Sequence, residues 1–318
     1  MKVLITGGAG FIGSTLADEL LAAGHQVLVI DNYQTGRRDN NTPHKNLTVI
    51  EGTIADVDLV NKAFDSFLPE KVVHAAASYK DPENWEEDVM SNILGTINVV
   101  RAAKRHNVSR FVYFQTSLCY GLKPLEQPIT LNHPLYSGRS EGGSSYAISK
   151  TGGEQYIQLS GLDFVSFRLA NAYGPRNLSG PLPTFFQRLT TGKACFVMDT
   201  RRDFIYVKDL TACVMKALNG LGTKGYYHIS TGSDYSIKQL FDSTLKALDM
   251  KLEKDVEVRP RGEDDVFTIL IDPSKTNKDF NWKAETPLET GIKAAIEWYK
   301  VNGITQTFTH LKNVDGKH

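Results

Sequence analysis

One tyrosine and one lysine in the sequence have the spacing of an acid–base pair. Tyr146 and Lys150 lie four residues apart in the run YAISK, and no other tyrosine is followed by lysine at that distance. Residues with this spacing share one face of a helix. A phenol titrates near pH ~10, so it acts as a base near neutrality only where positive charge stabilises the phenolate. We expect Lys150 to lower the pKa of Tyr146; an exposed helix pair without chemistry is the alternative.

A hydroxyl group is expected beside this pair. The run RFVYFQT predicts a buried strand that ends at Thr116, and Ser117 follows directly. Parallel sheets place their ligands at the carboxyl ends of the strands. Thr116 is therefore a candidate to share a hydrogen bond with a substrate oxygen and Tyr146. The alternative is a hydroxyl that only caps the end of the strand.

Three glycines follow the first predicted strand at the spacing of a phosphate-binding turn. Gly7, Gly10 and Gly13 form the pattern G-x-x-G-x-x-G, and a helix is expected to begin there. Glycines allow a tight turn and let backbone N–H groups approach a pyrophosphate, while the helix N-terminus favours negative charge. An ordinary strand-to-helix turn can carry the same triplet, so the context has to decide.

A carboxylate supplies that context. Asp31 ends the second predicted strand, where a carboxylate can accept hydrogen bonds from an adenosine ribose and repel a 2′-phosphate. Arg37 and Arg38 follow several residues later and oppose this preference only weakly. We therefore expect a dinucleotide site that prefers NAD to NADP.

These residues need a parallel sheet to bring them together. Up to about residue 170, short apolar β-branched runs alternate with helical segments, as in a parallel sheet covered on both faces. We predict an α/β fold with a Rossmann-type, doubly wound parallel sheet. The predicted strands are Lys2–Thr6, Gln26–Ile30, Leu47–Ile50, Lys71–His74, Arg110–Thr116 and Asp163–Arg168, and the predicted helices are Phe11–Ala23, Val57–Phe67, Ser91–His106 and Ser144–Leu159.

The character of the sequence changes after Asn171. Proline and glycine interrupt the chain there, and a helical stretch is expected near Thr184–Thr191. The strand-like runs Phe204–Val207 and Tyr226–Ile229 are expected to rejoin the first sheet. We predict an NAD-binding domain of residues 1–170 and about 204–232. A smaller, discontinuous α/β substrate-binding domain is predicted for residues 171–203 and 233–305.

Composition argues against several classes of protein. Lys+Arg and Asp+Glu are equal at 36 each, so no basic field suggests nucleic acid or a membrane surface as a partner. The three cysteines are far apart and lack the paired spacing of a zinc site or a disulfide framework. The N-terminal apolar run is too short for a signal sequence or a membrane span. We expect a cytoplasmic protein without a metal site.

Taken together, these residues resemble a known family. The chain is similar to the extended short-chain dehydrogenase/reductases, and within them to the NAD-dependent sugar epimerase/dehydratase group typified by UDP-glucose 4-epimerase. The resemblance covers nearly the whole chain. It is carried by GGAGFIG, Asp31, VVHAAA, SNILGTINVV, YAISK, FRLANAYGPR, RRDFIYVKDL, YYHISTGSDYSIKQL and DPSKTNKDFNW.

The resemblance assigns roles to individual residues. It implies that Tyr146, Lys150 and Thr116 carry the chemistry, that Lys150 also binds the nicotinamide ribose, and that Asn92 braces the edge of the sheet. Ser117, Asn171, Arg202 and Arg261 are implied to contact a nucleotide sugar. The implied NAD contacts are Gly7, Gly10, Phe11, Ile12, Gly13, Asp31, Asn32, Thr53, Ile54, Ala75, Ala76 and Lys150.

The arginines leave two questions open. A guanidinium fork matches phosphate oxygens, which suits Arg202 to a diphosphate. The alternative is a surface ion pair of Arg202 with Asp203 or Asp209, which lie nearby in the sequence. A second family arginine falls in an irregularly spaced run here, and both Arg259 and Arg261 are candidates for it.

Three departures from the family pattern bear on function. Thr53 stands where many relatives have aspartate, so its hydroxyl weakens or replaces a contact to adenine. Relatives that eliminate water carry Asp-Glu directly after the catalytic threonine, and decarboxylases carry glutamate two residues after it; Ser117 and Leu118 occupy those positions here. The missing carboxylates favour epimerisation. The segment 131–145 is long and rich in glycine and serine, which leaves the sugar open.

The resulting hypothesis is an NAD-dependent nucleotide-sugar epimerase, with UDP as the nucleotide and inversion at C4 through a transient 4-keto sugar. A dehydratase or decarboxylase with relocated acid–base groups, for which Cys119 and residues 134–145 are the local candidates, is the alternative. A non-catalytic dinucleotide sensor is a third hypothesis, although such relatives typically lose the tyrosine or the lysine. The helices Ser91–His106 and Ser144–Leu159 resemble the family's dimer helices, so a homodimer is expected.

Overall fold

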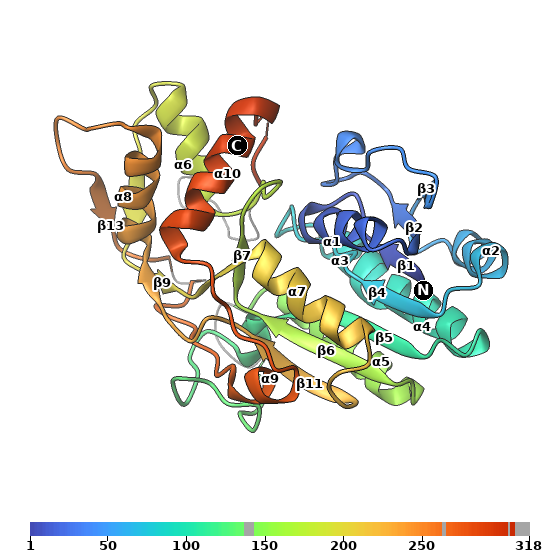
Figure 1. Cartoon of the computed structure of the whole chain (residues 1–318). Coiled ribbons are helices and arrows are strands. Elements are labelled where there is room, and N and C mark those ends of the chain that lie inside the picture. The colour runs from blue at the N-terminus through green and yellow to red at the C-terminus, as the bar shows by residue number, and fades with distance from the viewer. Residues whose placement is uncertain (137–142, 263–264, 305, 309–318) are drawn as a thin grey trace.

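A seven-stranded parallel sheet forms the centre of the protein (Figure 1). The computed structural model describes residues 1–136, 143–262, 265–304 and 306–308. The strand order is β11-β6-β5-β4-β1-β2-β3, so the winding reverses at β1 and β4. This confirms the predicted doubly wound α/β fold. The strands are β1 (Lys2–Thr6), β2 (Gln26–Asp31), β3 (Leu47–Glu51), β4 (Lys71–His74), β5 (Arg110–Thr116), β6 (Phe164–Leu169) and β11 (Gly225–Ile229).

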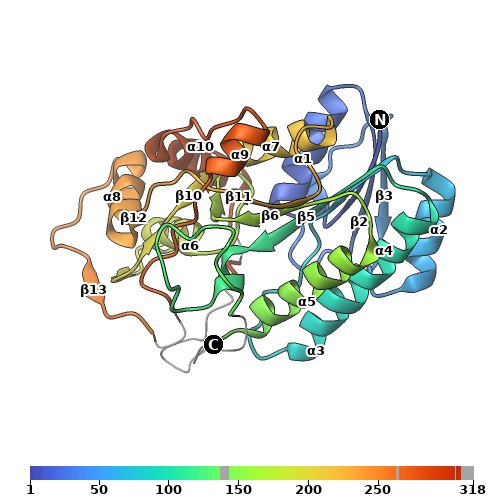
Figure 2. The same cartoon turned by 90° about the horizontal axis from the view of Figure 1, so that it is seen from below.

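Helices cover both faces of this sheet. Side chains of α1 and α7 pack on one face, and side chains of α2, α4 and α5 pack on the other. Figure 2 shows α4 and α5 lying side by side. Because both faces are covered, the strands are mainly apolar, which is the pattern that predicted them. The helices are α1 (Phe11–Ala22), α7 (Val207–Leu218), α2 (Val57–Phe67), α4 (Thr96–Arg105) and α5 (Ser145–Ser160), and α9 (Ser274–Asp279) lies beside β11.

The helix predicted for Ser91–His106 is built differently. It begins as the short α3 (Trp85–Asp88), widens into a π-helical segment (Val89–Gly95) and only then becomes α4. Asn92 lies in the widened turn. Its Oδ1 accepts a hydrogen bond from the backbone of Ser78 (2.9 Å), and its Nδ2 donates to Ser149 Oγ (3.0 Å). Asn92 therefore connects the loop after β4 to α5.

A second core lies beyond the carboxyl edge of the sheet, on the left in Figure 1. Helices α6, α8 and α10 bury a set of aromatic and aliphatic side chains against short strands. The elements are α6 (Pro181–Thr190), α8 (Ile237–Leu248), α10 (Leu288–Asn302), β7 (Asn171–Tyr173), β8 (Phe196–Met198), β9 (Arg201–Arg202), β10 (Phe204–Tyr206), β12 (Tyr235–Ser236) and β13 (Glu257–Arg259), besides short 3₁₀ turns at Arg38–Asn40 and Ser117–Tyr120.

One strand assignment from the sequence is wrong. β11 rejoins the central sheet as expected, but β10 pairs in parallel with β7 and not with the sheet. The physical reason is that β11 already occupies the edge beside β6, so the three-residue β10 pairs with the strand that leaves β6. The boundaries of the two predicted domains remain a prediction.

Within its described ranges the chain has no helix long and apolar enough to span a bilayer. The same residues contain no group of three or more His, Cys, Asp or Glu side chains that could hold one metal ion.

Candidate active site

A cavity of about 1290 Å³ lies between the carboxyl edge of the sheet and the second core. It exceeds the roughly 300–1,000 Å³ of a pocket for one drug-sized ligand, so it has room for two ligands. All the site residues predicted from the sequence line it, except Arg261. They are Gly7, Gly10, Phe11, Ile12, Gly13, Asp31, Asn32, Thr53, Ile54, Ala75, Ala76, Thr116, Ser117, Tyr146, Lys150, Asn171 and Arg202.

The glycine turn leaves no space for side chains. Gly7 has a φ of +70°, and a Cβ there would lie 2.7 Å from the Cα of Ala76. A Cβ on Gly13 would lie 2.3 Å from the carbonyl oxygen of Gly7. The turn ends at Gly10, which caps α1 without a side-chain hydrogen bond. The first N–H groups of α1 are therefore available to a phosphate group in the cavity.

Asp31 joins this turn to the second strand. Its Oδ2 accepts a hydrogen bond from the backbone N–H of Ala9 (2.9 Å), and its Oδ1 accepts one from Tyr33 (2.8 Å). Burial raises the pKa of the Asp31 carboxyl, and these backbone donors oppose the rise. The carboxylate is thus rigidly held at the cavity wall, where it could accept a hydrogen bond from a ribose hydroxyl.

The two arginines that could favour NADP are engaged elsewhere. Arg37 forms a salt bridge with Asp39, and Arg38 forms one with Glu51 (2.6 Å). Neither arginine lines the cavity. A 2′-phosphate would therefore meet the carboxylate of Asp31 and no adjacent guanidinium, which suits the site to NAD.

Tyr146 begins the face of α5 that borders the cavity. The helix starts at its N-cap, Ser144, whose side chain accepts a hydrogen bond from Ala147 (3.2 Å). The ring of Tyr146 meets that of Tyr79 edge-on, with centroids 6.2 Å apart. Desolvation raises the pKa of the Tyr146 phenol, and the negative charge of Asp88 acts in the same direction.

Lys150 is buried one turn further along α5. Its side chain is 2% exposed, and its Nζ lies 4.0 Å from the centroid of the Tyr113 ring. Burial lowers the pKa of Lys150 to about 7, against an opposing effect of Glu154. The exposed helix pair considered above is thereby excluded. In the polypeptide alone desolvation raises the pKa of Tyr146, and the lowering of that pKa expected from Lys150 is not observed.

Thr116 combines its two expected roles. Its Oγ1 accepts a hydrogen bond from the backbone N–H of Leu118 (3.2 Å), which caps the turn that follows β5. The hydroxyl also lines the cavity. Because this oxygen acts as the acceptor, the hydroxyl proton can still be donated to a ligand. Ser117 lies beside it and is 6% exposed.

Arg202 has an acidic partner that the sequence did not identify. It donates to the carboxylate of Asp265 and to the carbonyl oxygen of Val266 (2.9 Å). The predicted alternative, a surface pair with Asp203 or Asp209, is wrong. Asp203 is fully buried and accepts hydrogen bonds from the backbone after β11, while Asp209 accepts them from the loop before α10. Arg202 and Asp265 both line the cavity.

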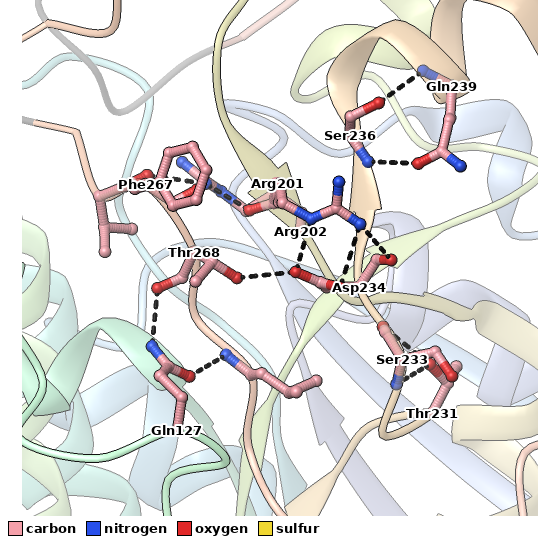
Figure 3. A network of polar contacts seen from close by, with 12 residues as sticks. Gln127, Arg201, Arg202, Thr231, Ser233, Asp234, Ser236, Gln239, Phe267 and Thr268 are labelled. Atoms are coloured by element: carbon pink, nitrogen blue, oxygen red, sulfur yellow. Dashed lines mark hydrogen bonds and ion pairs between the residues drawn. The ribbon is translucent and has the colours of Figure 1, made fainter.

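A polar network holds the strand of Arg202 in place (Figure 3). Arg201 Nε donates to Asp234 Oδ2 (2.8 Å), which also accepts a hydrogen bond from Thr268 (3.3 Å). Gln127 Nε2 donates in turn to the carbonyl oxygen of Thr268 (2.9 Å). The network therefore connects β9 to the segment that carries Asp265 and to the loop that follows the catalytic strand β5.

The second arginine of the family pattern lies away from the cavity. The Arg259 guanidinium stacks on Phe196 at 3.9 Å, and that of Arg261 lies 5.8 Å from the Phe267 ring. Neither arginine borders the cavity, so a ligand contact by Arg261 remains a prediction that the cavity lining does not favour. Arg188 of α6, which the sequence analysis missed, does line it.

The sequence did not identify several other residues that line the cavity. Tyr79 of the loop after β4 and Trp85 at the start of α3 line it, as do Thr307 and Phe308 after α10. The first two could have been noticed, because they follow the carboxyl end of a predicted strand. The predicted sugar-facing segment 131–145 is described only in part, since residues 137–142 lie outside the described residues.

The fold and the site together define a class of protein. A doubly wound sheet, an uncapped helix N-terminus at a glycine turn and a Tyr–Lys pair on one cavity make an enzyme of the extended short-chain dehydrogenase/reductase type. Residues 3–230 match the model of the NAD dependent epimerase/dehydratase family. The chain belongs to this family, and the predicted cofactor, NAD, is confirmed.

Solved structures and curated relatives agree with this assignment. The chain is 51% identical to the Bordetella bronchiseptica enzyme WbmH in complex with NAD+, with a TM-score of 0.91 over 95% of this chain and 99% of that one. It is 45% identical to WbmG of the same organism in complex with NAD and UDP, with a TM-score of 0.89 over 98% of each chain. The UDP-glucose 4-epimerase of Mycolicibacterium smegmatis is 28% identical over 94% of this chain and 99% of its own length.

Proposed function

We propose that the chain is a cytoplasmic, NAD-dependent nucleotide-sugar epimerase that inverts C4 of a UDP-linked sugar through a transient 4-keto intermediate. The observation that carries this proposal is one cavity lined by Tyr146, Lys150 and Thr116 but with Ser117 and Leu118 in place of carboxylates. The solved relative that holds both NAD and UDP supports the choice of nucleotide.

Each residue of the site has a part in this reaction. Tyr146 takes the proton of the sugar 4-hydroxyl, and Thr116 donates a hydrogen bond to the same oxygen. Lys150 binds the cofactor ribose and contributes positive charge near the phenolate. Bound NAD would supply reversible hydride transfer at C4 of the sugar, and its positive charge would favour the phenolate of Tyr146.

Arg202 is the proposed diphosphate contact. Its guanidinium is oriented by Asp265 and by the carbonyl oxygen of Val266. A donor held in one orientation loses little side-chain entropy when phosphate oxygens arrive. Asn171, whose backbone and side chain both donate to the carbonyl oxygen of Asp203, is the proposed contact to the nucleotide sugar.

Elimination and decarboxylation find little support in the described residues. Both reactions need an acid or base beside the sugar that epimerisation at C4 does not need. Cys119, one of the local candidates, is fully buried, and burial raises the pKa of its thiol. It is therefore unsuited to act as a base.

Turnover in D2O tests the proposed function. Hydride that leaves C4 and returns from the cofactor never exchanges with solvent, whereas chemistry at C5 removes a proton that does. With purified protein and a panel of nucleotide sugars, we expect an epimer without carbon-bound deuterium, and a 4-deuterated substrate that keeps its label, both measured by NMR. Deuterium at C5 would contradict simple epimerisation.

The choice of cofactor can be tested at Asp31. We expect the protein to purify with NAD. We expect Asp31→Ala to weaken NAD binding and to reduce the preference for NAD over NADP. The lost carboxylate both accepts hydrogen bonds and repels a 2′-phosphate, so the ratio of the two affinities should change by about tenfold or more. Calorimetry with both cofactors measures this. Equal affinities in the unmodified protein would refute the assignment.

A homodimer remains our proposal for assembly. Apolar side chains lie exposed on α5 and on the turn before α4; they are Met90, Leu94, Ile148, Tyr156 and Leu159. Two copies that pair these helices about a two-fold axis would cover them. Light scattering at micromolar concentration should give twice the chain mass of 35.3 kDa. A monomer at that concentration would contradict the proposed homodimer.

A further inference from the structure

The face of α5 that carries Tyr146 and Lys150 continues with a buried acid. Glu154 follows Lys150 by four residues and is fully buried. Its carboxylate accepts hydrogen bonds from Arg168 Nη2 of β6 (2.8 Å) and from Ser166 Oγ (2.6 Å). A carboxylate at this depth stays ionised only when it is paired and hydrogen-bonded, and Arg168 with Ser166 meets both conditions.

Arg168 has further partners on the side of its guanidinium that faces away from Glu154. Nη1 of Arg168 donates to the hydroxyl of Tyr120 (2.8 Å). That hydroxyl is 2.6 Å from Nε2 of His228, whose Nδ1 lies 2.9 Å from the carbonyl oxygen of Asp272. Arg168, Tyr120 and His228 are all buried. The ion pair is therefore oriented, with the carboxylate on α5 and the guanidinium bound to the strands beyond it.

Tyr113 packs against α5 beside the lysine. Its hydroxyl donates to the carbonyl oxygen of Lys150 (2.9 Å), and its ring faces the Lys150 ammonium. The ring also approaches the helix closely: a Cβ on Gly153 would lie 3.1 Å from the Tyr113 hydroxyl. The close packing fixes the ammonium and the carboxylate on one side of α5 in a medium that screens charge weakly.

Asp88 of α3 is a second buried acid beside α5, but its charge acts on Tyr146. Glu154, by contrast, is the charged group that acts on Lys150. The remaining titratable groups in this part of the interior do not supply negative charge. Burial lowers the pKa of the histidine well below neutrality and raises the pKa values of the tyrosines and the cysteine, so all of them are neutral. They are His74 of β4, Tyr113 of β5, Cys119 of the turn after β5 and Tyr146 of α5. Glu154 is also the group whose charge opposes the lowered pKa of Lys150.

We propose that Glu154 is a positioning residue for Lys150: its carboxylate, held by Arg168 and Ser166, is the buried negative charge that keeps Lys150 in its ammonium form. Glu154 does not line the cavity and acts through the lysine alone. The effect on turnover rests on the proposed epimerase function. The effect on the protonation of Lys150 does not.

The direct test is the titration of Lys150 in the protein as purified. Lysine labelled with 13C at Cε is followed by NMR against pH, and the Lys150→Arg variant assigns the signal. Glu154→Gln keeps the shape and one hydrogen-bond acceptor but removes the charge. We expect it to lower the pKa of Lys150 by about one unit or more, as loss of a nearby opposite charge does.

Two further variants separate charge from packing. Ser166→Ala removes a hydrogen bond to Glu154 but no charge, so the titration of Lys150 should stay close to that of the unmodified protein. The double variant Glu154→Gln with Arg168→Met removes both charges and avoids an unpaired guanidinium, which protects against simple misfolding. In this double variant, the pKa of Lys150 should still be lower than in the unmodified protein. An unchanged titration in both glutamine variants would overturn the proposal.

The pH profile of kcat gives the second readout. If Lys150 must be an ammonium ion, activity falls as pH rises through its pKa, so a lower pKa in Glu154→Gln moves the alkaline limb to lower pH. A structural role would reduce kcat without this shift. If the unmodified protein epimerises no nucleotide sugar, the proposed function fails, and the NMR titration still decides the role of Glu154.

Discussion

Replacement of Tyr146 by phenylalanine is expected to reduce kcat by about 10²–10⁴-fold, the usual contribution of a positioned acid–base group. The hydroxyl group is the only part of the side chain that is lost, and the edge-on ring contact with Tyr79 can persist. Nucleotide-sugar affinity should therefore change little. Steady-state kinetics together with calorimetric titration of the nucleotide sugar measure the two effects separately.

The matched control is Tyr79→Phe. Tyr79 lines the same cavity and is the ring partner of Tyr146, so this variant also removes one phenol hydroxyl from the site. We expect it to keep kcat within about tenfold of the unmodified protein, because the acid–base group remains. A Tyr146→Phe variant with near-normal kcat would show that the proton carrier lies elsewhere.

The second large effect is expected from Gly13→Ala. The added Cβ would lie 2.3 Å from the carbonyl oxygen of Gly7 and 2.9 Å from the Cα of Gly8, and both are backbone atoms that cannot rotate away. The turn between β1 and α1 must then shift, at a cost of about 1–3 kcal/mol in overpacking. Because the turn is also the proposed phosphate site, we expect protein that purifies with little NAD and has a lower Tm.

Gly10→Ala provides a graded comparison. A Cβ at Gly10 would lie 3.2 Å from the same carbonyl oxygen, a contact that a shift of a few tenths of an ångström relieves. NAD content, measured by absorbance after denaturation, should fall in the order unmodified protein, Gly10→Ala, Gly13→Ala. Full NAD occupancy in Gly13→Ala would mean that the turn is not the cofactor site.

The sequence predicted those parts of the fold that local pattern controls. The strands of the central sheet are short apolar runs and the helices between them have regular spacing, so most were placed within a residue or two. The helix predicted for Ser91–His106 is an exception, because α4 starts only at Thr96, after a π-helical segment. The partner of β10 was not predictable in this way. Phe204–Tyr206 has the composition of a strand, but its pairing with β7 depends on β11, which arrives later in the chain and takes the free edge of the sheet.

The same distinction applies to the residues of the candidate site. Residues in strand ends and in the glycine turn were found because their places follow from the sheet. The direction of a long side chain does not follow from it. Arg202 reaches Asp265, 63 residues away, and Arg261 lies beside Phe267 and away from the cavity, because loops of the second core meet there. Spacing along the chain contains no signal for such contacts.

The route of the chain between β6 and β11 limits how the protein can move. β7 follows β6 after the single residue Ala170, and the chain returns through β10 and α7 to β11, which pairs with β6 in parallel. The chain crosses again from β11 to β12 and from α9 to α10, so several connections attach the second core to the sheet. Several attachments restrain both rotation and sliding of the two parts. We expect the end of the cavity beside Asn171, where β6 leads directly into β7, to keep its dimensions as ligands enter and leave.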